Sequence, residues 1–168
     1  MLTARLLRAG PRRSEGQAQT ELPLVLFVLF TLLFFPLIAL LSLGVSYGCC
    51  ATLNSIQLRE AALIAKSQAE NQAGPVKHNI VETWKSTGIG KFAKLVGDPQ
   101  TDVSYIDGVT DPISGIADKV VVVSTTCELA PFLPQSSSFL PKAPGLNQPI
   151  TLSFSSQRPL ENQDNYKL

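Results

Sequence analysis

The sequence predicts an α+β protein in which a long N-terminal helix crosses a membrane and continues into a small domain with a three- or four-stranded, mainly antiparallel sheet. Three observations support this prediction. Residues 22–45 include no charged side chain. Residues 49–71 contain neither Pro nor Gly and are rich in Ala, Leu and Gln, which favours a helix. Beyond residue 100, apolar and polar residues alternate in short segments, as they do in strands with one buried face.

The apolar run predicts a transmembrane helix over residues 17–47. The 24 residues of its uncharged part would form a helix about 36 Å long, which is enough to cross a hydrocarbon core of about 30 Å. A single segment can satisfy its own backbone hydrogen bonds in lipid only as a helix. The run is too long for a cleaved signal peptide and lacks the small-residue cleavage site of one, so we interpret it as a membrane span.

The distribution of charge predicts the orientation of this helix. Residues 1–16 hold four arginines and one glutamate, and we interpret them as an extended cytoplasmic leader. After the run, the first cation is Arg59, which Glu60 follows at once. The positive-inside rule therefore places the N-terminus in the cytoplasm and residues from about 48 onward outside. The rest of the chain has ten Lys and Arg against twelve Asp and Glu, which does not favour binding to nucleic acid.

Residues 48–72 are interpreted as the same helix continuing outside the membrane, ended by Gly74-Pro75. The apolar residues that fall on one side of it are Leu53, Ile56, Leu63 and Ile64. Residues 73–160 are interpreted as a periplasmic α+β domain, and residues 161–168 as a loose polar tail. The domain begins with a second helix at about 76–85, which we expect Thr87-Gly88-Ile89-Gly90 to break.

Three segments of the domain predict strands. Residues 102–107 alternate and end in Asp107-Gly108, a turn signal. Residues 119–127 include four consecutive valines, which predicts a central strand buried on both faces. Residues 150–155 alternate as a strand with one buried face.

Three cysteines, Cys49, Cys50 and Cys127, fall on the outer side in this topology, where an oxidising compartment would allow a disulfide. Vicinal cysteines rarely bridge each other, so the candidates are Cys49 or Cys50 with Cys127, and the choice stays open. No Cys/His spacing predicts a zinc site. Five aspartates between residues 98 and 118 lack the spacing of a calcium loop, and we interpret them as solvated turn residues.

The residues around the start of the apolar run carry a family resemblance. Residues 16–21, Gly-Gln-Ala-Gln-Thr-Glu, resemble the processing site of type IV pilin-like proteins, in which a prepilin peptidase cuts after a glycine and a glutamate stands fifth after the cut. The fuller stretch 12–24, and Arg-Glu-Ala-Ala-Leu-Ile-Ala at 59–65, resemble the TadE/TadG-like proteins of Flp (tight adherence) pilus systems. The resemblance covers residues 12–70 well and the β region loosely.

The resemblance implies a pilin-like fold and a non-enzymatic role as a minor pseudopilin-like component of Flp/Tad-type pilus biogenesis. It implies a bacterial inner-membrane protein with its C-terminal domain periplasmic or extracellular. Its partners would be the membrane, pilin and other pseudopilins, the inner-membrane pilus platform and prepilin peptidase, with no cofactor. The cut would fall between Gly16 and Gln17. Glu21 would pair with the new amine and set the register between packed helices, or else lie among lipid headgroups near Arg12 and Arg13.

Three other functions remain as alternatives. The first is an unprocessed single-pass anchor of an envelope or secretion protein. The second is a lipoprotein acylated at Cys49, because Gly48 precedes that cysteine, although Ser46 stands where such sites have Leu. The third is an anchored enzyme. Only one histidine, His78, is present, and no catalytic constellation is visible, so we expect no enzymatic activity.

Overall fold

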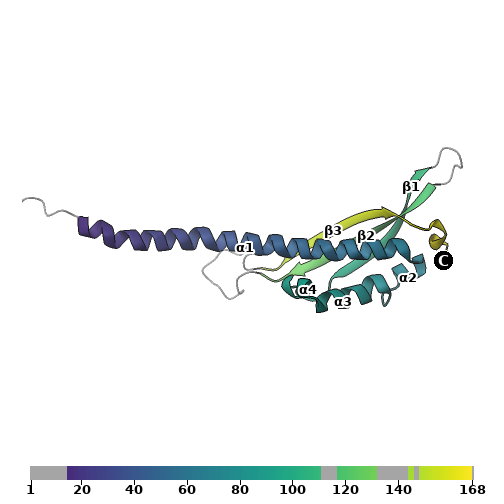
Figure 1. Cartoon of the computed structure of the whole chain (residues 1–168), viewed down its shortest axis with the longest axis horizontal. Coiled ribbons are helices and arrows are strands. Elements are labelled where there is room, and N and C mark those ends of the chain that lie inside the picture. Colours follow the sequence, from purple (N-terminus) through teal and green to yellow (C-terminus); the bar gives the residue numbers. More distant parts are fainter. Residues whose placement is uncertain (1–14, 111–116, 132–143, 146–147, 168) are drawn as a thin grey trace, which may run out of the picture. The chain divides into compact units, whose positions relative to one another are not determined.

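The computed structural model describes residues 15–110, 117–131, 144–145 and 148–167. Its contacts divide the chain into two units, residues 1–38 and 39–168, which we describe separately. One long helix, α1, is followed by short helical segments and then by the strands (Figure 1). The elements are α1 (Glu15–Leu63), α2 (Lys66–Glu70), a π-helical turn (Pro75–Asn79), α3 (Ile80–Ser86), α4 (Gly88–Phe92), β1 (Gln100–Thr110), β2 (Ala117–Leu129), β3 (Ile150–Pro159) and a 3-10 turn (Gln163–Tyr166).

The described part of the first unit is the N-terminal portion of α1. The helix begins at Glu15, two residues ahead of the expected boundary, and continues without a break through Pro23 and Pro36. Every large apolar side chain from residue 22 to residue 38 is between 41% and 75% exposed. By length and composition, α1 is the one helix of the described residues that could cross a membrane. The extended leader expected at residues 1–14 lies outside the described residues.

The second unit contains a three-stranded antiparallel sheet in the order β1-β2-β3 (Figure 1). The α+β class, the antiparallel pairing and the central position of β2 confirm the prediction from sequence. Along β2 the side chains at positions 121, 123, 125, 127 and 129 are buried, and these face the helices. The opposite face is only half-buried at Val120 and Val122, so the prediction of a strand buried on both faces was wrong.

The core lies between this inner face of the sheet, the second half of α1 and the short helices. One cluster consists of Cys50, Leu53, Val81, Trp84, Ala93, Cys127, Leu129 and Phe154. The other consists of Ala61, Ala62, Ala69, Val76, Val103, Val121, Val123 and Leu160. Both clusters draw on α1 and β2, so the contact between these two elements organises the domain.

The structure has no turn at Asp107-Gly108, because β1 continues to Thr110 with a shift in register between Asp107 and Thr110. Gly108 instead lies where the strand has no room for a side chain. A Cβ atom at this position would lie 2.8 Å from Cγ2 of Val120, which is closer than such atoms approach in proteins. Glycine within a strand often marks such a close approach and a local irregularity.

The long helix ends at Leu63, earlier than the predicted end near residue 72, and Ala65 is extended before α2 begins. The C-terminal segment explains this difference. The carbonyl of Ala62 accepts a hydrogen bond from the backbone N–H of Glu161 at 3.2 Å, and the carbonyl of Leu63 accepts one from Nδ2 of Asn165 at 2.9 Å. In a longer helix, these two carbonyls would accept hydrogen bonds from the backbone N–H groups of the next turn. The tail expected to be loose is therefore ordered against the end of α1.

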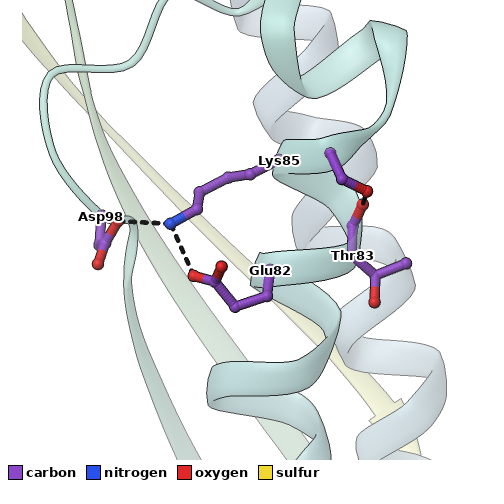
Figure 2. A network of polar contacts seen from close by, with 5 residues as sticks. Glu82, Thr83, Lys85 and Asp98 are labelled. Carbon is purple, nitrogen blue, oxygen red and sulfur yellow. Dashed lines mark hydrogen bonds and ion pairs between the residues drawn. The ribbon is translucent and has the colours of Figure 1, made fainter.

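The predicted second helix is present but begins with a π-helical turn, and Thr87 breaks it as expected. The glycines after Thr87 do not form a loop, because they belong to α4. Thr87 caps the start of this helix, since its hydroxyl accepts a hydrogen bond from the backbone N–H of Gly90 at 3.2 Å. Lys85 of α3 binds the carboxylates of Glu82 and Asp98 at 2.7 Å each, which links α3 to the segment before β1 (Figure 2). The hydrogen bond to Asp98 is the main cause of the raised pKa of Lys85.

Candidate functional site

The predicted processing motif lies in the first two turns of α1. Gly16 and Gln17 are helical in their backbone, and Glu21 is an exposed residue one turn after Gln17. Residues four apart share a face of a helix, and helical side chains lean toward the N-terminus. A carboxylate at position 21 can therefore reach an amino group at position 17. The arginines before the motif lie outside the described residues.

The helix that follows the motif presents apolar side chains in every direction. The rings of Phe30 and Phe34 lie 5.2 Å apart, and they line a shallow groove with Phe27, Thr31, Phe35 and Ile38. The hydroxyl of Thr31 donates to the carbonyl of Phe27 at 2.7 Å, which satisfies it within the helix. Such a bond allows a threonine to face lipid without an unpaired polar group.

Two buried amides join α1 to the sheet. Asn54 donates through Nδ2 to the carbonyl of Val123 and to the hydroxyl of Thr125, both at 3.0 Å. Gln57 accepts from the same hydroxyl through Oε1 at 2.7 Å. Both amides are almost fully buried, at 2% and 0% exposure. We call this set, Asn54, Gln57 and Thr125, the amide clamp.

Gln57 extends the amide clamp toward two further elements. Its Nε2 donates to the carbonyl of Val76 and to the hydroxyl of Thr101, both at 2.9 Å. One side chain thus connects α1, the π-helical turn, β1 and β2. Buried polar groups need such partners, and a network that satisfies them fixes one arrangement of the packed elements. The amide clamp therefore sets the rotation and the axial position of α1 on β2.

Sequence reasoning missed the amide clamp because it searched this helix for apolar residues. Of the side expected to pack, Leu53 is buried, but Ile56 and Leu63 are 44% and 43% exposed. The buried positions of this part of α1 are instead Cys50, Leu53, Asn54, Gln57, Ala61 and Ala62. Their spacing is helical once the two amides are counted as buried residues, and this spacing could have indicated the buried face of the helix.

The three cysteines occupy different environments, and none is bridged. Cys50 and Cys127 are both fully buried in the same core cluster, whereas Cys49 is only partly buried. A hydrogen bond between the thiols of Cys50 and Cys127, together with burial, raises the pKa of Cys50. Of the two candidate partners of Cys127, Cys50 shares its buried cluster, whereas Cys49 is a partly buried residue packed against that cluster.

Tyrosine and lysine side chains hold the C-terminal turn. The Nζ atoms of Lys66 and Lys119 lie 4.4 and 4.8 Å from the ring centre of Tyr166, and that ring packs edge-on against Tyr105. Lys119 also pairs with Asp107. Burial raises the pKa of Tyr105 to about 12, and the charge of Glu70 adds to the shift. These contacts join the C-terminal turn to α2, β1 and β2, so we interpret them as contacts that stabilise the domain.

The described part of the chain forms no metal centre. No three His, Cys, Asp or Glu side chains of these residues gather as metal ligands, and His78 is exposed on the π-helical turn. Asp98 and Asp107 pair with lysines, and Asp111 lies outside the described residues. No protein-family model, curated protein or solved structure matches the chain.

Proposed function

We propose that this protein is a minor pseudopilin-like component of a bacterial Flp/Tad-type pilus machine, which acts through helix packing and protein contacts and carries out no reaction. The observation that carries the proposal is the exposed apolar surface of α1 directly after the Gly16–Glu21 motif. A helix that is apolar all round needs lipid or other helices around it. Its partners would be the membrane, pilin, sibling pseudopilins, the inner-membrane platform and prepilin peptidase.

The second half of α1 supports the same role by a different property. From Leu43 onward, one side of the helix packs against the core cluster that includes residues of β2 and β3, and the amide clamp fixes its rotation there. A fixed rotation determines which side chains of the helix remain exposed, among them Ile56 and Leu63. Such a surface can pack reproducibly against neighbouring subunits in a fibre.

Glu21 has a physical reason to take a partner. A carboxylate near the bilayer is unfavourable, although less so than the roughly 2.5–3.5 kcal/mol it costs at the centre. A cut after Gly16 would create a cationic amine at Gln17, within reach of this carboxylate in the same chain or in a neighbour. A pair with a neighbour's amine would fix the axial register of packed helices, because each displaced arrangement would leave that charge unpaired.

Mass spectrometry of the N-terminus, on protein extracted from its native membranes, tests this proposal. We expect the chain to start at Gln17. Gly16→Leu should abolish the cut and leave a longer chain, whereas the matched variant Gly10→Leu, farther from the cut, should be processed normally. An unprocessed wild-type chain would contradict the processing and favour a single-pass anchor of an envelope or secretion protein. A chain that starts at an acylated Cys49 would identify a lipoprotein.

We also expect Glu21→Ala to leave membrane insertion intact and to lower the amount of assembled pilus about tenfold, which corresponds to the loss of roughly 1.4 kcal/mol of pairing energy. The measurement is the yield of sheared pili, with the membrane fraction quantified in parallel. Glu15→Ala is the matched control, because Glu15 would leave with the leader. Normal pilus yield in Glu21→Ala would remove the register role from Glu21.

A further inference from the structure

Cys50 and Cys127 face each other where α1 crosses β2. The amide clamp defines the alignment of the two elements, since Asn54 binds Val123 and Thr125. One helical turn before Asn54 is Cys50, and two residues after Thr125, on the same face of the strand, is Cys127. A helical turn advances about 5.4 Å and two strand residues about 6.7 Å. Because these two distances are similar, the residue one turn before Asn54 lies opposite the residue two positions after Thr125. These two residues are Cys50 and Cys127.

The environment of the two sulfurs agrees with this alignment. Both side chains have 0% exposure and belong to the same buried cluster, which also contains Leu53 of α1 and Leu129 of β2. Cys49 is adjacent in sequence but lies about 100° around the helix from Cys50, since a helix has 3.6 residues per turn. We infer that Cys50 and Cys127 form a disulfide that cross-links α1 to β2, with Cys49 left as a free thiol.

The bond needs an oxidant, which we identify by class as the disulfide of a thiol-oxidising protein or small molecule. The thiolate of one cysteine attacks that disulfide, forms a mixed disulfide and releases one thiol of the oxidant. The second cysteine then displaces the other oxidant thiol. The chain loses two protons and two electrons in total, and the oxidant gains them. Because both sulfurs are buried, the first attack takes place before α1 has packed on β2 or during a local opening.

Thiol counting on the purified full-length protein in detergent tests the inference. The protein is equilibrated with oxidised or reduced glutathione, quenched in acid, unfolded and alkylated. We expect one alkyl group on each oxidised chain and three on each reduced chain, since the chain has three cysteines. Digestion should yield a linked peptide that contains Cys50 and Cys127. Three alkyl groups after oxidation, or a link through Cys49, would overturn the inference.

Serine variants separate the three thiols. Cys49→Ser should keep the bridge and take no alkyl group after oxidation, whereas Cys127→Ser should take two. A further measurement needs no variant. The urea midpoint of the oxidised wild-type protein should be higher than that of the reduced protein, because the cross-link stabilises the folded state. Equal midpoints in the two forms would contradict a bridge that holds the folded state.

The occurrence of the bond in the cell rests on the outward topology of the proposed function. Acid-quenched alkylation of intact cells tests that part separately. A protein that bridges with glutathione but is fully reduced in cells would support the pair and contradict the topology. A protein that does not bridge with glutathione would contradict the pair and leave the topology unaffected.

Discussion

Gln57→Leu is expected to lower the free energy of unfolding by about 3 kcal/mol, because it leaves buried polar groups without their partner at nearly constant volume. Gln57 makes three hydrogen bonds, to Thr125, Val76 and Thr101, and it is fully buried. Urea unfolding of the full chain in detergent measures the change. The fluorescence of Trp84 reports it, since this residue is the single tryptophan and is buried in the core.

Two controls make this prediction specific. Gln68→Leu changes the same residue type on α2, where the side chain is exposed, and should shift the free energy by less than about 0.5 kcal/mol. Thr125→Val removes the partner hydroxyl, and the double variant with Gln57→Leu should be less destabilised than the sum of the two single variants. Additive effects in that cycle would mean that the two side chains do not interact.

Gly90→Ala is expected to destabilise the domain by about 2 kcal/mol or more, because the added methyl group has no room. A Cβ atom at this position would overlap the carbonyl of Trp84 and lie 2.7 Å from the Cα of Lys85. Both neighbours are backbone atoms of the end of α3, so the chain would have to separate α4 from α3. The urea midpoint, again followed by the fluorescence of Trp84, measures the effect.

Gly88→Ala provides the matched control two residues earlier in α4. Apart from the adjoining residues and the nearby backbone of α4 itself, no atom lies within 4 Å of a Cβ atom at Gly88. Alanine also favours a helix over glycine by up to about 1 kcal/mol. The control should therefore be neutral or slightly stabilising. Equal destabilisation by both alanines would show that helix packing at Gly90 is not the cause.

The strands could be predicted because the alternation along β3 and the β-branched valines of β2 are both typical of strands, although the valine run suggested two buried faces where only one is buried. The end of α1 could not, since residues 63–66 contain neither Gly nor Pro and the helix ends there through bonds from Glu161 and Asn165. These partners lie about a hundred residues away, and no local pattern contains them. In the same way, Gly108 is typical of a turn, but β1 continues through it to Thr110, and a Cβ atom at this position would collide with Val120, which lies beyond any local pattern.

The candidate functional residues differ in the same way, since some form a local motif and others come together only in the fold. The motif at residues 16–21 is local, so the sequence alone indicates it. The amide clamp and the contact between Cys50 and Cys127 arise only when α1 meets β2, and sequence reasoning could name the cysteines without choosing between Cys49 and Cys50. The polar character of Asn54 and Gln57 concealed a buried face that a purely apolar search would not find.

The contact between α1 and β2 also determines the order in which the domain can form during synthesis. Asn54 and Gln57 bind residues that follow them by 68 to 71 positions. At a synthesis rate of about 5–20 residues per second, the helix waits roughly 4–14 s for its strand. During that interval the face of α1 that packs on β2 is uncovered, and Gln57 can bind only its earlier partners, Val76 and Thr101. The side of α1 that carries Asn54 therefore completes its packing only after residue 125 has been synthesised.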